Sequence, residues 1–300
     1  MLVKSYSLKK ALWVIMAGLS CMVSGHAAAC QLETSGAPTA PRIEYDVYGF
    51  DTAIASTNFE LRNAGETECI LDIVAKDLAS FPPPFDFGEA GVLIDVIAPG
   101  LQRPQNSQNI EGIFALTLGP GAARTVQLDF TAQQNISVPA GLYNRDITIG
   151  VRSYETSELL EEWITDLSLF SSSQAQVNIA GTSGNFNKDV YADTIDFGEA
   201  ELGETRRVFV QARSNSYATM TIRSDNNGKM KHSNQADATI GYSAVLDNQT
   251  LDLSTPFVLP GLNATDLNGI SQPLDLTIDS LNNPYAGQYS DRIVIEIEAR

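Results

Sequence analysis

Short runs of alternating apolar and polar residues, separated by Gly, Pro and Asn, are the sequence feature that most limits the fold of this chain. Side chains on a β-strand point alternately to its two faces, so a period of two is typical of strands that bury one face. Strands at this spacing, with turn residues between them, are typical of β-sandwiches. The sequence therefore predicts an all-β fold. The segments are Asn58–Leu61, Glu68–Val74, Ile113–Leu118, Thr125–Phe130, Asp146–Val151, Gln176–Ile179, Arg206–Ala212, Ala218–Arg223, Leu274–Ile278 and Arg292–Ile297.

One segment also fits a helical pattern. Within Glu155–Leu169, an apolar face is formed by Leu159, Leu160, Trp163 and Ile164 if the segment is helical. The same residues fit a loop followed by a strand over Trp163–Phe170. The sequence alone leaves both interpretations open.

A repeated motif near the end of each half of the chain indicates a duplicated fold. Ala140–Tyr143 reads A-G-L-Y and leads into the alternating segment Asp146–Val151. Ala286–Tyr289 lies 146 positions later, reads A-G-Q-Y and leads into Arg292–Ile297. Each copy predicts a turn followed by a strand with alternate inward aliphatic residues.

A weaker repeat supports the same division. Phe59–Asn63 resembles Phe209–Arg213, 150 positions further along. The small, polar stretch Gly181–Asn185 is typical of a linker. We therefore expect two β-sandwich domains, over residues 30–181 and 186–300.

The first 29 residues read as a secretory signal. Three lysines precede the uncharged apolar run Ala11–Val23, and small residues follow at positions that suit cleavage after Ala27 or Ala29. The run has 13 residues, too few for a membrane span of about 20. We expect an exported protein that passes through the periplasm to the cell surface and is not embedded in a membrane. A lipid on Cys30 is the alternative. The lysines are Lys4, Lys9 and Lys10.

The remaining chain is strongly acidic. The signal takes three of the 19 Lys and Arg and none of the 36 Asp and Glu, which leaves a formal charge of −20. Such a charge repels phosphate backbones and anionic lipid, so nucleic acid is excluded as a partner. Solubility outside the cell explains the charge.

Two cysteines remain after the signal, and they predict one disulfide. Cys21 leaves with the signal, so Cys30 and Cys69 are the thiols exposed to an oxidising compartment. Their bond would close a loop of 40 residues. By loop entropy it would stabilise the fold by roughly 3–4 kcal/mol.

The residues needed for enzymatic chemistry are largely missing. His232 is the single histidine after the signal, and it lies in a polar stretch typical of an exposed loop. A two-histidine metal site is therefore ruled out, and no nucleotide-binding glycine motif is present. Asp225–Gly228 resembles a calcium loop but lacks the later Glu, so a hairpin turn is expected. Carboxylate pairs of the glycosidase kind stay open, yet no pair stands out. We expect no enzyme, no cofactor and no metal.

The C-terminal strand carries the first candidate interaction site. Ile293, Ile295 and Ile297 point to one face, and the sequence ends at Arg300. An immunoglobulin-like sandwich usually has one more strand after this one. An apolar edge without it is open to pairing with another chain. The alternative is that this strand simply completes the fold.

Apolar residues in expected loops of the first half form the second candidate site. The proline-rich stretch Phe81–Phe87 does not suit a central strand, and Gly91–Leu101 is a possible strand bounded by Gly and Pro. If exposed, these residues form an adhesive surface; the alternative is burial under the sandwich. The candidates are Phe81, Phe85, Phe87, Val92, Leu93, Ile94 and Ile97.

Several stretches of the second half resemble the spore coat protein U domain, the pilin-type module of archaic chaperone–usher pili. They are Ile195–Gly198, Tyr217–Arg223, Ser224–Met230, Ile240–Tyr242 and Ala286–Asp291. The first half is similar more loosely, through Cys30, Cys69 and the A-G-x-Y motif. The second half has no cysteine pair, in which it departs from the family.

The resemblance implies an immunoglobulin-like, pilin-like fold in which the C-terminal domain lacks its last strand. A periplasmic chaperone and then a neighbouring pilus subunit would donate that strand, and an outer-membrane usher would assemble the pilus. Subunits within a pilus carry an apolar donor segment before their first domain, whereas Gln31–Arg42 is polar and contains Pro38 and Pro41. The resemblance therefore implies a tip adhesin that mediates surface attachment.

Two other interpretations remain. One is a structural coat or matrix protein with two complete sandwiches, and the weaker one is a secreted carbohydrate-active enzyme. In the first half, Asp166–Phe170 and Gln176–Ile179 follow the repeated motif. We expect these segments to supply the closing strand that the second half lacks.

Overall fold

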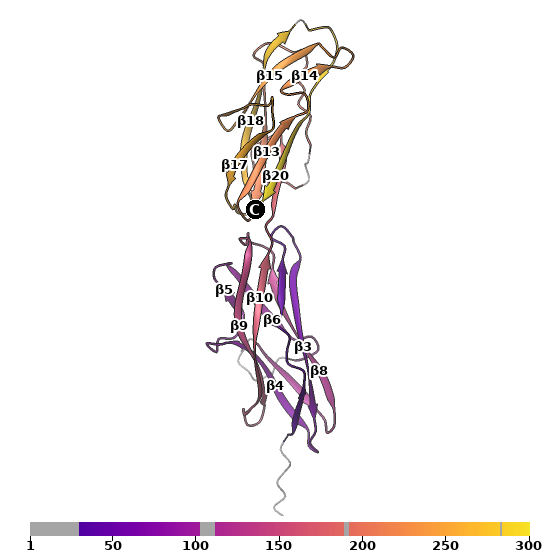
Figure 1. Cartoon of the computed structure of the whole chain (residues 1–300). Helices are drawn as coiled ribbons and strands as arrows, with labels where there is room; N and C mark the ends of the chain where they lie inside the picture. The colour runs from indigo at the N-terminus through magenta and orange to yellow at the C-terminus, as the bar shows by residue number, and fades with distance from the viewer. Residues whose placement is uncertain (1–29, 103–111, 189–191, 283) are drawn as a thin grey trace, which may run out of the picture.

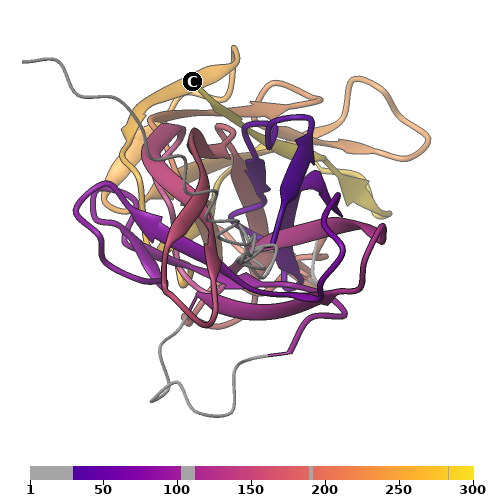
Figure 2. The same cartoon turned by 90° about the horizontal axis from the view of Figure 1, so that it is seen from below.

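The computed structural model describes residues 30–102, 112–188, 192–282 and 284–300, and these residues form strands and no helix. The expected signal lies outside the described residues. Figure 1 shows two β-rich bodies stacked end to end, with the C-terminus between them. Viewed along this axis in Figure 2, the two bodies overlap, so the molecule is elongated.

The first body is a sandwich of two five-stranded sheets. Alternate residues of both sheets face inward and form one buried cluster, in which Phe85, Phe130, Leu61, Ile73 and Ile147 are each at most 2% exposed. The first sheet has the order β1 (Leu32–Ser35), β3 (Thr52–Asn63), β8 (Ala123–Gln133), β6 (Val92–Ile97) and β5 (Phe85–Phe87). The second has the order β2 (Arg42–Tyr45), β10 (Leu159–Ser171), β9 (Gly141–Ser153), β4 (Cys69–Asp77) and β7 (Ile113–Leu118).

The second body has a seven-stranded and a three-stranded sheet around a separate buried cluster, which includes Val210, Ile222 and Leu276. The larger sheet has the order β11 (Ala175–Ala180), β12 (Thr205–Ser214), β18 (Ile270–Asn282), β15 (Thr239–Leu246), β14 (Lys229–His232) and β19 (Tyr289–Ser290), with β16 (Gln249–Leu251) also on β15. The smaller sheet has the order β17 (Phe257–Leu262), β13 (Ala218–Ser224) and β20 (Ile293–Ala299). The predicted all-β fold of two sandwiches is confirmed.

All ten predicted segments fall on strands, to within one residue at their starts. In the ambiguous segment Glu155–Leu169 the first four residues form a loop and the strand β10 begins at Leu159, so the interpretation as a loop followed by a strand is correct. The inward residues Thr165, Leu167 and Leu169 of β10 are buried at every second position. A period of two therefore decides against the helical pattern.

The expected closing role of Gln176–Ile179 is wrong. These residues lie in β11, which pairs with β12 through Val177 opposite Ala212 and Ile179 opposite Val210, so they belong to the second sandwich. Asp166–Phe170 does lie in the first sandwich, within β10.

The link between the sandwiches is also not where the sequence places it. Gly181–Asn185 follows β11, and the carbonyl oxygen of Gly184 accepts a hydrogen bond from Gln211 Nε2 at 3.1 Å. The connection runs instead through Ser172–Gln174, between β10 and β11. Ser172–Gln174 is short and polar, and hydrogen bonds between Asn215 and both the carbonyl oxygen of Ser172 and the N–H of Gln174 hold it.

Candidate functional site

Strand β20 forms one edge of the three-stranded sheet. It pairs with β13 through Ile293 opposite Ser224, Ile295 opposite Ile222 and Ile297 opposite Met220. Within the described residues no strand pairs with its other side. Strand β20 therefore offers a free row of backbone hydrogen-bonding groups.

The internal repeat shows what this free side means for the core. Ile147, Ile149 and Val151 of β9 occupy the positions that match Ile293, Ile295 and Ile297 of β20, 146 residues later. All three residues of β9 are 0% exposed. The three isoleucines of β20 are only half-buried, although they pack against the second core.

Strand β10 accounts for the difference. It runs antiparallel to β9 and parallel to β2, and it places Thr165 opposite Ile147 and Trp163 opposite Ile149. Its own Leu167 and Leu169 are fully buried in the first core. The second sandwich has no equivalent strand among its described residues, so its core is left partly uncovered beside β20.

Strand β11 borders the same uncovered region from the other sheet. It is an edge strand that lies near β20, and its Val177 and Ile179 are half-buried against the second core. We call this region the open edge and define it by Val177, Ile179, Ile293, Ile295 and Ile297. It combines two unpaired strand edges with five partly covered aliphatic side chains, the features to which an added β-strand binds in β-augmentation.

Asp291 holds the start of β20 in place. Its carboxylate accepts hydrogen bonds from the hydroxyls of Ser224 and Tyr242, each at 2.5 Å, and from the backbone N–H of Asn226 at 3.0 Å. Burial raises the pKa of Tyr242, and the hydrogen bond to Asp291 raises it further, so the phenol remains a donor. Asp291 therefore ties the start of β20 to Ser224 of β13 and Tyr242 of β15.

The structure divides the predicted adhesive residues into two groups. Phe85, Phe87, Val92 and Ile94 are at most 5% exposed, because they are the inward residues of β5 and β6. For these four candidates the alternative holds, and they are buried under the sandwich. Phe81, Leu93 and Ile97 are 66%, 56% and 44% exposed, respectively.

A buried carboxylate fixes the loop that carries Phe81. Asp77 accepts a hydrogen bond from the Phe81 backbone N–H at 2.8 Å and from Arg145 Nη2 at 2.6 Å. Burial raises the pKa of Asp77, but the hydrogen bonds and charge of Arg145, together with the backbone donors of Phe81 and Ala79, outweigh it and hold the pKa below its ordinary value. The apolar side chains of Leu78 and Phe81 are thus presented on an ordered loop, at 56% and 66% exposure.

The structure also places the cysteines and the histidine that the sequence singled out. The predicted disulfide joins Cys30 and Cys69, with an S–S distance of 2.07 Å. His232 stacks edge-on against Tyr289, and its Nε2 lies 3.3 Å from the carbonyl oxygen of Ala286. Across the described ranges, no three His, Cys, Asp or Glu side chains are grouped to hold a metal ion. The same residues include no helix long and apolar enough to cross a membrane.

Asp225–Gly228 is a turn, but it does not connect a hairpin. It links β13 to β14, which lie in different sheets. Asn227 and Gly228 have φ of 55° and 73°, the left-handed region in which Asn and Gly are favoured. The predicted turn at Asp225–Gly228 is therefore confirmed, but the predicted hairpin, in which the two flanking strands would pair with each other, is wrong.

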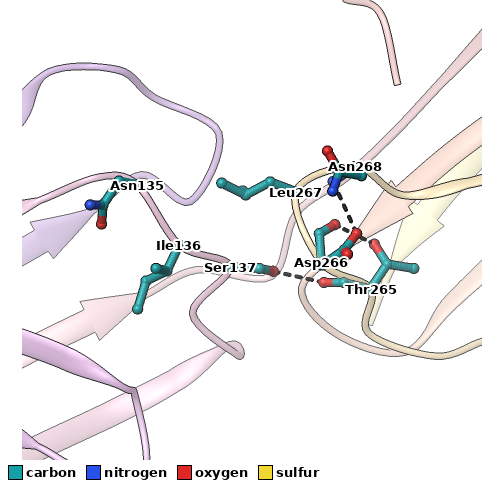
Figure 3. A pocket seen from close by; sticks show the side chains of 7 residues that line it. All are labelled: Asn135, Ile136, Ser137, Thr265, Asp266, Leu267 and Asn268. Atoms are coloured by element: carbon teal, nitrogen blue, oxygen red, sulfur yellow. Dashed lines mark hydrogen bonds between the residues drawn. The ribbon is translucent and has the colours of Figure 1, made fainter. Parts of the chain in front are cut away.

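A shallow hollow lies where the two sandwiches meet (Figure 3). Asn135, Ile136 and Ser137 line it from the first sandwich, and residues 265–268 line it from the second. The Ser137 hydroxyl donates to the carbonyl oxygen of Thr265 at 2.8 Å across the junction. The polar contacts of this junction were not indicated by any sequence motif.

The sequence matches no protein-family model and no curated protein. Among solved structures, the chain is similar to a chaperone–tip adhesion subunit pre-assembly complex, CsuC–CsuE, from the archaic chaperone–usher Csu pili of Acinetobacter baumannii. The TM-score is 0.45 at 12% identity, and the match covers 89% of this chain and 100% of the other.

Two further structures are similar at lower scores. The CupB6 tip adhesin from Pseudomonas aeruginosa has a TM-score of 0.35 at 10% identity, covering 89% of this chain and 94% of that one. CfaE, the adhesive subunit of the CFA/I fimbria of enterotoxigenic Escherichia coli, has a TM-score of 0.32 at 13% identity, covering 89% and 81%.

Proposed function

We propose that this chain is an exported, non-enzymatic pilus subunit of the spore coat protein U kind, whose second sandwich accepts a β-strand from another chain. The proposed domains are residues 30–173 and 175–300, divided at the short connection between β10 and β11. The first domain contacts the target surface and the second joins the pilus, which is the arrangement of a tip adhesin. The partners are a periplasmic chaperone, an outer-membrane usher and a neighbouring subunit.

The observation that carries the proposal is the unequal burial of matching residues. In β9, which has β10 beside it, the residues Ile147, Ile149 and Val151 are 0% exposed. In β20, which has an unpaired edge, the matching Ile293, Ile295 and Ile297 are half-buried. Full burial of an aliphatic side chain stabilises a fold by about 1.5–3 kcal/mol. Burying the exposed remainder of the three isoleucines would therefore raise the free energy of unfolding by roughly 3 kcal/mol. That is a large share of the net stability of a domain, typically about 5–15 kcal/mol.

Backbone pairing favours the same occupant. A strand added beside β20 would satisfy its free N–H and C=O groups and present alternate side chains to the core, as β10 does beside β9. In the first sandwich this strand comes from the same chain. A strand from another chain would therefore pair with β20 in the way that β10 pairs with β9 within this chain.

The N-terminal residues support a position at the end of an assembly. Leu32–Ser35 pairs with β3, and Cys30 is bonded to Cys69. These residues are therefore engaged in the first sandwich and are not free to complete a neighbour. The second sandwich can accept a strand, while the segment from Cys30 onward has none to offer.

Exposed apolar residues of the first sandwich are the proposed contact surface. Phe81, on the loop fixed by Asp77, is the most exposed of the three remaining candidates, followed by Leu93 and Ile97. Their side chains do not contribute to the buried core. A hydrophobic contact surface is consistent with this exposure.

A fused donor strand tests the proposal. The mature chain is extended after Arg300 by a four-residue turn and a strand of alternating apolar residues, so that the strand can run back along β20. The melting temperature of the second sandwich should rise by 10 °C or more. The control extension has the same length, with Asp at every inward position, and should leave the melting temperature unchanged.

The alternative, a coat or matrix protein with two complete sandwiches, gives the opposite result. If the apolar and the Asp-containing extensions have equal effects, the open edge is not an acceptor. Purification of the chain from the periplasm adds a second readout, because a co-purifying chaperone is expected only when the edge is open.

A further inference from the structure

The junction between the sandwiches is built unlike a flexible linker. Domains of one chain usually move relative to each other unless their interface is large or tightly bonded. Here Asn215, which follows β12 in the second sandwich, is 1% exposed and reaches into the end of the first sandwich. Its backbone carbonyl accepts a hydrogen bond from the N–H of Ala140 at 3.0 Å.

The side chain of Asn215 bonds to four residues in two segments of the chain. Its Nδ2 lies 2.8 Å from the carbonyl oxygen of Ser172, 3.1 Å from Ser171 Oγ and 3.2 Å from the carbonyl oxygen of Val138. Its Oδ1 accepts a hydrogen bond from the Gln174 N–H at 2.7 Å. Both ends of the amide are therefore used, and a rotation at this site would leave buried polar groups unpaired.

Arg213 makes a second contact across the junction. Its guanidinium lies 4.0 Å from the ring centre of Tyr48 in the first sandwich and 4.3 Å from that of Phe186 in the second. It also donates to Gln176 Oε1 at 2.6 Å and to the carbonyl oxygen of Leu267 at 3.1 Å. Arg213 and Tyr48 are each 8% exposed, so these contacts are shielded from water.

A tight loop of the second sandwich completes the junction. Leu267 packs against the core of the first sandwich, beside the hollow in Figure 3. Gly269 follows it with φ of 67°, and a Cβ there would lie 2.4 Å from the carbonyl oxygen of Ala212. Gly269 thus permits the loop to lie directly on β12 next to Arg213.

We propose that the two sandwiches move as one rigid body, and that Arg213 and Asn215 are the residues that fix their relative orientation. Arg213 also bonds to Gln176 of β11 within the second sandwich, and Asn215 bonds to Gln174 just before β11. The two residues that contact the first sandwich therefore also contact the strand that borders the open edge. This inference goes beyond the proposed function, because it requires no donor strand and no target.

The test measures a distance between the far ends of the two sandwiches. Glu155→Cys lies on the turn after β9, and Asn234→Cys on the turn after β14, both exposed. Spin labels are attached to the mature chain without reductant, so that the Cys30–Cys69 disulfide stays closed. Pulsed electron paramagnetic resonance should give one narrow distance distribution. A broad distribution in this parent chain would overturn the proposal.

Substitutions at Arg213 and Asn215 test whether these two residues keep the sandwiches in a fixed orientation. With Arg213→Ala and Asn215→Ala together, the distribution should become at least twofold wider. Arg213→Gln, which removes the guanidinium with its stacking and its hydrogen bonds but keeps a polar side chain, serves as a milder change if the double variant does not fold. A width unchanged by Arg213→Gln and by any folded double variant would contradict the assignment.

Asn63→Ala is the matched control. Asn63 is 0% exposed and donates to the carbonyl oxygens of Thr67 and Leu118, so this variant loses the same kind of buried bonds within the first sandwich alone. Its distance distribution should stay as narrow as that of the parent. Equal broadening in Asn63→Ala would mean that the effect reflects lost stability rather than a loosened junction.

Discussion

Asp77 illustrates how one buried charge organises an exposed loop. Its side chain is 5% exposed, and its oxygens accept hydrogen bonds from Arg145 and from the loop backbone. Nothing in the local sequence distinguishes Asp77 from the many acids on strand faces and in turns. Its partner Arg145 lies 68 residues away, and only the pairing of β4 with β9 brings the two together.

Arg145→Ala should destabilise the first sandwich by about 2 kcal/mol, because it leaves a buried carboxylate without its charged partner. The loss should be measurable by chemical denaturation at pH 7. The melting of the second sandwich should not change. A loss below about 0.5 kcal/mol, typical of exposed pairs, would show that the pair is solvated.

The Asp77–Arg145 pair also predicts that the stability of the first sandwich depends on pH. The folded-state pKa of Asp77 is lowered from 3.8, so its contribution is complete above that value and is lost as the pH falls through the lowered pKa. The stability difference between the parent and Asp77→Asn should therefore be constant at neutral pH and shrink below about pH 4. A difference that grows on acidification would contradict this sign.

Strands β9 and β20 are nearly the same segment in two environments. Strand β9 begins within its A-G-x-Y motif, at Gly141, and β20 follows its copy. Both pair with a central strand on one side, but only β9 has β10 on the other. Alternation along the sequence predicted both strands correctly. The sequence did not reveal which sheet each joins, because inward-facing residues look the same whichever strand covers them.

Matched substitutions in these strands should give different results. Ile149→Asp places a charge in a fully covered core and should lower the free energy of unfolding of the first sandwich by more than about 4 kcal/mol, enough to unfold it. Ile295→Asp lies at the matching position of β20 and should lower the free energy of unfolding of the second sandwich, without a donor strand, by less than half as much. Ile295→Asp should also abolish the rise in melting temperature that a fused donor strand produces. Chemical denaturation of both variants, with and without the fusion, measures each effect, and equal costs without a donor would mean that β20 is already covered.

The fold class and most strands were predictable from local pattern, and the contacts that place them were not. The proline-rich stretch around Phe85 did not suit a central strand, and the stretch around Ile94 was only a possible strand, yet β5 and β6 bury both residues in the first core. Gln176–Ile179 reads equally well as the last strand of one sandwich or the first of the next. Asn215 carries no motif at all, since an Asn after a strand is usually a turn residue.

The whole chain combines a self-completed sandwich with one that has an open edge. Fragments divided at the observed connection should therefore behave differently. Residues 30–173 include β10 and the disulfide, and should form a soluble monomer that unfolds cooperatively. Residues 175–300 include β11 but lack a strand beside β20, and should melt at a much lower temperature or aggregate.

Circular dichroism and light scattering on both fragments test this expectation, with the full mature chain as the reference. The second fragment should recover when the apolar donor strand is fused to it. Cooperative melting of unaided residues 175–300 above about 60 °C, a value typical of complete domains, would count against an open edge.

The direction of β20 determines how an attached strand would bear a load. β20 runs lengthwise along the elongated molecule and ends between the sandwiches (Figure 1). Ladder hydrogen bonds are perpendicular to their strands, so tension along this axis shears them all together instead of unzipping them one after another. All the hydrogen bonds between β20 and an attached strand would therefore have to break together under tension. The junction at Asn215 would transmit the same tension to the first sandwich.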